Sequence, residues 1–199
     1  WAGNAVQGDL GTSFSGRNAG SSGAGSRSVV DLIAPRFWNT LFLASITAVI
    51  AVPISLLLGI TTALYRNSIY DRSVSTATLT TISFPEFFVA YILILVLGSL
   101  WPIFPSLANV NQSTPLGERL FRTVLPAMTL TLVIIAHMMR MTRAAIINLL
   151  ASPYIQMARL SGASRTEVIV KHALPNAWAP IATVIAFNLA YLVVGVVVV

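Results

Sequence analysis

Four long runs of apolar residues, separated by polar segments, set the pattern along this chain. The first two, residues 41–64 and 76–100, are 24 and 25 residues long, and Glu86 is the only charged residue in either. A helix needs about 20 mostly apolar residues to cross a bilayer, whereas a strand of a membrane barrel has about ten residues that alternate in polarity. Both runs are therefore predicted to be membrane-spanning helices.

The third and fourth runs, residues 124–147 and 177–199, have the same character. The third carries no charge before Arg140 and Arg143, whose long side chains can reach the membrane surface from the end of a helix. The fourth is uncharged and reaches the last residue of the chain, so we expect the natural sequence to continue beyond it. The predicted fold class is all-α, a polytopic membrane helix bundle, with residues 38–199 as its transmembrane domain.

The polar segments differ in length and composition. Residues 1–37 are rich in Gly and Ser and lack the apolar periodicity of a core, so we interpret them as an extracytoplasmic loop region that is partly flexible. Residues 65–72 form a short polar turn, and residues 101–122 form a longer loop that opens with Trp101, a residue type typical of the membrane interface. The chain shows neither a starting Met nor a signal-peptide pattern, which indicates a truncated sequence.

Composition excludes several classes of protein. Hydrophobic residues make up 56% of the chain and charged residues only 9%, against roughly 25% charged in a soluble domain. The net charge of +6 does not predict a nucleic-acid partner, because the basic residues are scattered in polar segments and form no single face. The chain has no Cys, and its two His residues are too far apart in sequence to argue for a metal site.

The basic residues favour one orientation in the membrane. If the turn at residues 65–75 is cytoplasmic, the segment 140–176 lies on the same side, which then carries seven Lys or Arg residues against five on the other. Two of those five, Arg17 and Arg27, lie in a long loop, where charge has little influence on topology. We therefore place the segment 140–176 in the cytoplasm.

Residues 150–177 interrupt the apolar pattern with a segment that carries several helix start and stop signals. Ser152 followed by Pro153 predicts an N-cap with Pro in the first helical position, and Gly162 is expected to end that helix. Ser164 and Glu167 have the spacing of a capping box, so a second helix should start there.

The second helix is expected to run through His172 and to end at Pro175. Two short helices around a glycine turn suit docking into a groove of another protein. The alternative is an amphipathic helix pair that lies on the membrane surface.

The same segment carries a resemblance to a known family. Ala158, Gly162, His172 and Leu174-Pro175 follow the spacing of the cytoplasmic loop of ABC-importer permeases, whose pattern is E-A-A-x3-G-x9-I-x-L-P. Gln156 and Met157 replace the Glu and first Ala of the pattern, and His172 replaces its Ile. The residues that the resemblance assigns to an ATPase-coupling loop are Gln156, Ala158, Arg159, Gly162, Ala163, Glu167, His172, Leu174 and Pro175.

The stretch "YIQMARLSGASRTEVIVKHALPNA", with "GDLGTSF" and "RFWNTLFLA" near the start of the chain, is most similar to the oligopeptide/dipeptide (peptide/nickel) branch of these permeases, of the first-permease type. The resemblance extends from Gly8 to the last apolar run. It implies the type I ABC-importer permease fold, with about four of six spans present in an internal fragment. It also implies a multi-pass location in the inner (plasma) membrane of a bacterium or archaeon.

The function implied is that of a permease subunit, which moves di- or oligopeptides inward by alternating access. The partners implied are a second permease subunit, two cytoplasmic ATPase subunits and an extracytoplasmic solute-binding protein. ATP and Mg would bind to the ATPases, and no cofactor to this chain, which lacks a phosphate-binding loop and is not expected to be an enzyme. Nickel or another small solute is an alternative cargo within the same family.

A different class of function also fits part of the pattern. A secondary transporter or channel driven by an ion gradient would use Glu86 as a proton or ion site. Three polar residues in apolar runs are candidates for a translocation path: Glu86, His137 and Asn188. For Glu86 the alternative is a structural role beside the kink expected at Pro85, and for His137 it is packing or a helix–helix hydrogen bond near the cytoplasmic end of its span.

Overall fold

The structure is a computed structural model that describes residues 10–13, 28–110, 113–164 and 167–196, apart from the side chains of Arg159, Val170 and Leu174. The described chain is helical, as predicted. Its elements are α2 (Val29–Leu64), α3 (Ile69–Ser83), α4 (Glu86–Leu93), the π-helix η2 (Ile94–Leu100), α5 (Leu116–Arg122), α6 (Val124–Leu150), α7 (Pro153–Leu160), the π-helix η3 (Val168–Ala173) and α9 (Leu174–Gly195). The only β pairing among the described residues is an isolated bridge between Thr12 and Ser28.

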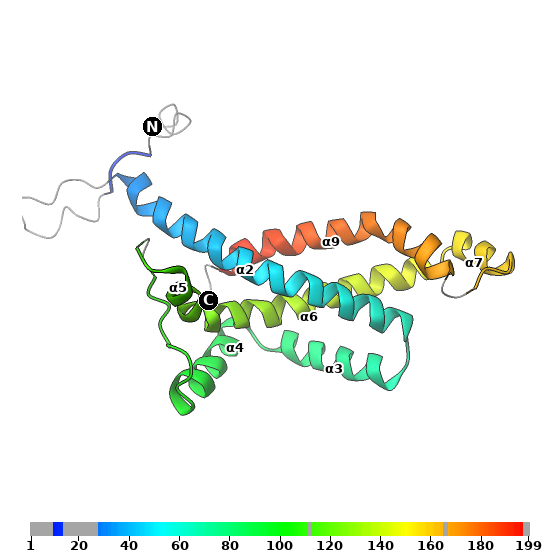
Figure 1. Cartoon of the computed structure of the whole chain (residues 1–199), viewed down its shortest axis with the longest axis horizontal. Coiled ribbons are helices and arrows are strands. Elements are labelled where there is room, and N and C mark those ends of the chain that lie inside the picture. The colour runs from blue at the N-terminus through cyan, green and yellow to red at the C-terminus, as the bar shows by residue number, and fades with distance from the viewer. Residues whose placement is uncertain (1–9, 14–27, 111–112, 165–166, 197–199) are drawn as a thin grey trace, which may run out of the picture.

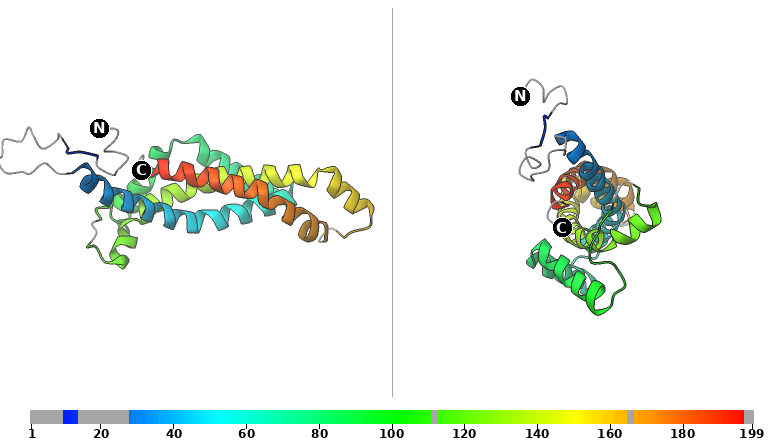
Figure 2. Two further views of the ribbon diagram at one scale, coloured as in Figure 1. Left: turned by 90° about the horizontal axis from the view of Figure 1, so that it is seen from above. Right: turned by 90° about the vertical axis from the view of Figure 1, so that its left-hand side faces the viewer.

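The helices form one elongated bundle around α6 (Figures 1 and 2). Helix α6 contacts α2 along much of its length and also packs against α9, α3 and α4. The short helix α7 and the π-helix η3 lie at one end of the bundle, whereas α5 and the start of α2 lie at the other (Figure 1). Below, these ends are called the hairpin end and the α5 end.

Small residues bring α2 and α6 into close contact. A stripe of buried small residues recurs every four positions along α2: Thr47, Ala51, Ser55, Gly59 and Ala63. A Cβ added at Gly59 would lie 2.7 Å from the Cβ of Thr142 and 2.9 Å from the backbone oxygen of Met139. In lipid the hydrophobic effect does not drive helices together. Close packing of their backbones therefore contributes much of the stability of a membrane bundle.

Helix α2 is longer than the apolar run that predicted it. It begins at Val29, so the last nine residues of the predicted loop region 1–37 are helical. The Ser28 hydroxyl accepts a 3.3 Å hydrogen bond from the Val30 N–H, which fixes this earlier start. At 36 residues the helix is about 54 Å long, well beyond the roughly 30 Å of a hydrocarbon core. The helix is therefore longer than a straight span requires.

The second apolar run is not one straight span. Helices α3 and α4–η2 meet at Phe84 and Pro85 with a bend of 99°. Proline lacks an N–H and disfavours a helical conformation in the residue before it, so the helix breaks there. Among the described residues, three helices are long and apolar enough to cross a membrane, and the predicted four are reached only if this bent pair counts as one span.

Helix α3 has many hydroxyl side chains for a membrane segment, and four of them are satisfied by the backbone of the same helix. The hydroxyls of Thr78, Thr80, Thr81 and Ser83 each donate to the backbone oxygen four residues earlier. A hydroxyl paired in this way inside its own helix costs little in an apolar environment.

Other boundaries differ from the sequence predictions, and α3 begins at Ile69, inside the turn predicted at residues 65–72. The segment 101–122, expected to be a loop, contains α5 from Leu116 to Arg122. Helix α6 continues to Leu150, which places His137 at its middle and corrects the position expected near the cytoplasmic end. Arg143, near the end of α6, pairs with Asp71 of α3, which lies in the polar segment predicted at residues 65–72.

Candidate functional site

The helix–turn–helix segment predicted at residues 150–177 is present at the hairpin end of the bundle (Figure 1). Helix α7 starts at Pro153 as expected, but the Ser152 side chain does not cap it. The backbone oxygen of Ser152 accepts from the N–H groups of Ile155 and Gln156, at 3.1 Å each, whereas its hydroxyl is buried without a partner among the described residues. The Gln156 side chain donates to the Ala151 backbone oxygen at 3.2 Å.

Gly162 ends α7 in the left-handed conformation, with φ +87°. The Ala163 N–H bonds back to the Ala158 oxygen at 3.3 Å, which is the six-residue closure of a Schellman motif with Gly162 in its left-handed position. A Cβ at Gly162 would meet nothing within 4 Å, so conformation and not space selects glycine here. The predicted break is confirmed.

The capping box is half formed. The Ser164 hydroxyl accepts from the Glu167 N–H at 3.3 Å, as predicted. The Glu167 carboxylate does not return the bond but accepts from Lys171 Nζ at 2.8 Å. This pair lowers the pKa of Glu167 below its ordinary value and raises the pKa of Lys171 above its own. A lysine one turn away offers the carboxylate a charge-assisted partner, so the side chain turns along the helix.

The second half of the segment is a π-helix that continues into a membrane helix. Residues Val168–Ala173 form η3, and α9 starts directly after it at Leu174. Pro175 therefore does not end a helix, which corrects the prediction. It lies in the first turn of α9, where a missing N–H leaves no bond unmade.

The segment has an apolar core of its own. Ile155, Val168 and Ala173 are fully buried, and Ala158 and Ala163 pack against them. This core also contacts Leu149 and Leu150 at the end of α6. We call the unit formed by residues 152–173 the hairpin. The core of the hairpin is therefore continuous with the end of α6, the central helix of the bundle.

A polar contact closes the two arms of the hairpin. The Tyr154 hydroxyl and His172 Nδ1 form a 2.7 Å hydrogen bond, and their rings meet edge-on at 5.5 Å. The position where the family pattern has Ile therefore contributes an inter-arm contact in this chain. Of the other predicted coupling residues, the side chains of Arg159 and Leu174 lie outside the described part of the structure.

The hairpin also exposes apolar side chains that the sequence analysis did not single out. Tyr154, Met157 and Leu160 are 52%, 64% and 82% exposed, although all three belong to the same eight-residue helix that buries Ile155. Their spacing of three residues places them along one side of α7. The signal was present in the sequence as a second apolar stripe on this helix. It indicates a surface that another protein or a membrane covers.

Two of the three residues predicted for a translocation path, Glu86 and His137, contact Tyr191 of α9. The Tyr191 hydroxyl of α9 donates to Glu86 Oε1 at 2.6 Å, and the rings of Tyr191 and His137 lie 6.0 Å apart. Glu86 thus has a partner on another helix beside the bend at Pro85. Spacing along the chain carries no information on the distance between Glu86 and α9, so the sequence analysis missed Tyr191.

Asn188, the third of these residues, lies one turn before Tyr191 and is buried between α9 and α6. It is 3% exposed, and its amide donates to the Val184 backbone oxygen at 2.7 Å and contacts the Met141 sulfur at 3.7 Å. The side chain is satisfied between α9 and α6. Clusters of His, Asp or Glu that could hold a metal are absent from the described residues.

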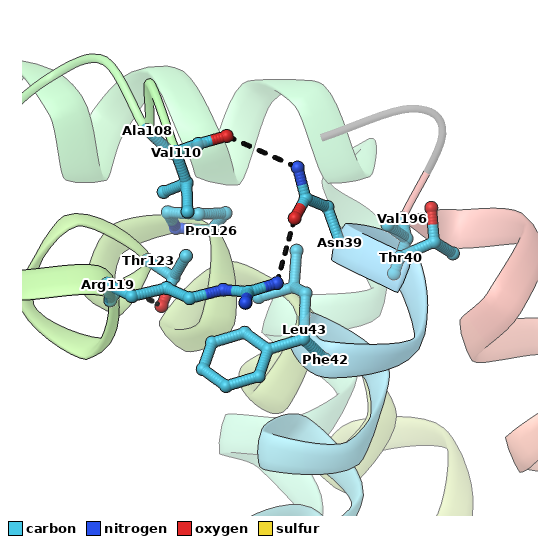
Figure 3. Close-up of a pocket in the computed structure, with 10 residues that line it drawn as sticks. All are labelled: Asn39, Thr40, Phe42, Leu43, Ala108, Val110, Arg119, Thr123, Pro126 and Val196. Carbon is cyan, nitrogen blue, oxygen red and sulfur yellow. Dashed lines mark hydrogen bonds between the residues drawn. The ribbon is translucent and has the colours of Figure 1, made fainter. Parts of the chain in front are cut away.

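A pocket lies at the α5 end (Figure 3). It is a cavity of about 190 Å³. Its wall includes Arg119 of α5, whose Nη2 donates to Asn39 Oδ1 of α2 at 2.8 Å. The Asn39 amide nitrogen in turn donates to the backbone oxygen of Val110 at 3.3 Å. The Arg119 side chain and Asn39 therefore join α5, α2 and the loop between η2 and α5.

These features define a class of protein: a multi-pass membrane helix bundle that carries a folded polar hairpin at one end. Comparison with known proteins then gives the family. Residues 52–199 match the model described as "Binding-protein-dependent transport system inner membrane component". The chain belongs to this family, which makes it a multi-pass inner-membrane component of a transport system with the type I importer permease fold.

Curated relatives agree with this family. The chain is 35% identical over 196 residues to the glutathione transport system permease protein GsiC of Escherichia coli (strain K12), and equally to that of Shigella dysenteriae serotype 1 (strain Sd197). It is 34% identical to the protein of the same name from Shigella boydii serotype 4 (strain Sb227). Each alignment covers 98% of this chain but only 58% of the relative, so the chain spans little more than half the length of these permeases.

Proposed function

We propose that this chain belongs to the transmembrane subunit of an ATP-driven importer, which moves di- or oligopeptides inward by alternating access. The observation that carries the proposal is the hairpin. Its turn depends on a left-handed glycine, and its core is shared with the end of α6. Membership of a family of transport-system membrane components supports the same reading.

The hairpin is the proposed contact with a motor subunit. In this reading it lies in the cytoplasm, and the exposed side chains of Tyr154, Met157 and Leu160 insert into a groove of an ATPase. ATP and Mg bind to that ATPase and not to this chain. Closure of the ATPases displaces the hairpins, and the contact with α6 converts that displacement into movement of the spans.

The remaining partners follow from the same proposal. A second permease subunit completes the pathway, and a solute-binding protein delivers the cargo at the α5 end, which then faces the outside. Peptide is the proposed cargo because the relatives are named for glutathione, itself a small peptide. Nickel complexes and other small solutes are the alternatives that the experiment must exclude.

The test is uptake of a labelled dipeptide by proteoliposomes that contain the full-length subunit with its operon partners. Gly162→Val is compared with Gly11→Val, because both glycines have positive φ and open space around a Cβ. Each substitution forces a left-handed valine, at a cost of about 1–2 kcal/mol, but only one lies in the hairpin. We expect Gly162→Val to lose ATP-dependent uptake while the complex stays assembled, and Gly11→Val to retain it.

Three other outcomes contradict parts of the proposal. Equal uptake by both variants would show that the hairpin does not couple ATP hydrolysis to transport. ATP hydrolysis that responds to nickel or another solute but not to peptides would refute the cargo alone. Uptake that runs on an ion gradient without any ATPase would refute the importer class and favour a secondary transporter.

A further inference from the structure

The positively charged side chain of Arg119 lines the cavity at the α5 end and has no acidic partner within the described structure. The ion pairs among the described residues of the whole chain join Arg122 to Glu118, Arg143 to Asp71 and Lys171 to Glu167. None of them involves Arg119. The residues that line the cavity include no Asp or Glu: Asn39, Thr40, Phe42, Leu43, Ala108, Val110, Arg119, Thr123, Pro126 and Val196. A partly buried guanidinium without an acidic partner is costly to keep, which points to a ligand.

The guanidinium of Arg119 is held in place before any ligand arrives. Its carbon lies 4.0 Å from the centre of the Phe42 ring, a cation–π contact from below, and Asn39 accepts one of its N–H groups. The bond from Asn39 to Val110 turns the amide oxygen of Asn39 toward Arg119 (Figure 3). The cation is therefore fixed by neutral groups, which leave its charge unbalanced.

Arg119 still has donors to offer. Its Nε–H is buried and has no hydrogen-bond partner among the described residues, and the side chain as a whole is only half-buried. Planar N–H donors on a guanidinium match the two oxygens of a carboxylate. The neighbouring Arg122 differs, since Glu118 and the Asn109 backbone oxygen already use its donors.

The size of the cavity limits what enters it. Pockets that enclose a whole small molecule are typically about 300–1,000 Å³, so a cavity of about 190 Å³ accepts one end of a peptide and not all of it. Apolar side chains of Leu43, Pro126 and Val196 line the remaining wall, which suits the side chain of a terminal residue. The cavity also lies opposite the hairpin, at the end where cargo would enter.

We propose that this cavity binds the terminal carboxylate of the incoming peptide through Arg119, and that it thereby selects peptides with a free carboxyl end. The inference rests on the proposed peptide-import function. It adds a recognition site on the permease itself, separate from whatever the binding protein recognises.

The test compares a labelled dipeptide with the same dipeptide carrying a C-terminal amide. Each is supplied on saturating binding protein to proteoliposomes of the full complex, and the ratio of maximal uptake rates is measured. We expect the native complex to favour the free carboxylate, and Arg119→Gln to reduce that preference by about tenfold, the effect of losing a charge-assisted contact. Arg119→Lys keeps the charge but not the planar donors, so an intermediate ratio is expected.

Arg122→Gln is the matched control, because Arg122 lies on the same short helix and pairs with Glu118. It should leave the ratio unchanged. An unchanged ratio in both Arg119 variants, with peptide uptake intact, would overturn the carboxylate site while leaving the proposed function in place. A loss of uptake in Arg119→Gln that depends on anionic lipid and is equal for both peptides would also overturn it, in favour of a lipid headgroup. Failure of the native complex to transport either peptide would refute the proposed cargo itself.

Discussion

Arg143 of α6 and Asp71 of α3 form a two-point ion pair, with Nε–Oδ1 and Nη2–Oδ2 distances of 2.8 Å each. Asp71 is 3% exposed and also accepts the backbone N–H of Asn67 at 2.9 Å. Asn67 has φ 66°, the left-handed conformation that turns the chain between α2 and α3. The pair therefore holds this turn, and the start of α3, against the central helix.

Breaking this pair from one side should destabilise the bundle strongly. Arg143→Ala leaves a buried carboxylate without its counter-charge, and we expect a loss of about 3–5 kcal/mol in the free energy of unfolding. Arg140→Ala, three residues earlier on an exposed part of the same helix, should cost less than about 0.5 kcal/mol. Denaturant unfolding of the detergent-solubilised subunit measures both. A double replacement, Asp71→Leu with Arg143→Met, should recover most of the loss. If Arg143→Ala lost no more unfolding free energy than Arg140→Ala, the structural role of the ion pair would be contradicted.

The contact of α2 with α6 at Gly59 should not accept even one methyl group. A Cβ there approaches the rigid backbone oxygen of Met139, so Gly59→Ala is expected to cost about 1–3 kcal/mol and to lower the melting temperature. Gly117→Ala in α5 meets nothing within 4 Å and should be neutral or slightly stabilising. Circular dichroism melting of the two variants in the same detergent is the comparison. Equal melting temperatures would mean that the helices are farther apart than this structure places them.

The hydrogen bond from Tyr191 to Glu86 should stabilise the packing of α4 against α9. Tyr191→Phe removes only the hydroxyl, and we expect a loss of about 0.5–1.5 kcal/mol. Glu86→Gln keeps an oxygen that accepts the bond and should cost less. Tyr91→Phe, on the exposed side of α4, is the control for losing a hydroxyl.

Uptake by the same variants separates the two roles considered for Glu86. A structural role predicts that Glu86→Gln transports peptide at close to the native rate. Loss of uptake in Glu86→Gln, with the native melting temperature retained, would instead assign the carboxylate to the translocation path.

The Glu167–Lys171 pair predicts how hairpin stability depends on pH. The pKa of Glu167 is lowered from its ordinary value of 4.5, so its contribution is present above that value and is lost as the pH falls through the lowered pKa. The pKa of Lys171 is raised from 10.5, so its contribution is present below that value and lost at higher pH. Amide hydrogen exchange of residues 167–173 should therefore show no change in opening free energy between pH 5 and 9.

Below pH 4.5 a small loss of protection is expected, and it should weaken in high salt because both groups are exposed to solvent. Glu167→Gln should abolish this acid-dependent loss. A transition near neutral pH in that variant and in the native chain alike would assign the pH response to another group.

Much of the candidate site was readable in the sequence because its signals are local. The break at Gly162, the start of α7 at Pro153 and the Ser164 cap each depend on a few neighbouring residues. The π-helical arm was not predictable in this way, since Pro175 is compatible both with the end of one helix and with the first turn of the next. The apolar core of the hairpin supports the second arrangement by packing Val168 and Ala173 on Ile155.

The sequence alone determined the membrane class, the approximate spans and the family resemblance, because a run of about 20 apolar residues has few other places to fold than a bilayer. Only the tertiary structure decided which polar residues meet. Asp71 and Arg143 are 72 positions apart, Asn39 and Arg119 are 80 apart, and Glu86 and Tyr191 are 105 apart. Such partners are selected when helices pack at small residues such as Gly59, and packing of one helix on another is not encoded in the periodicity of either.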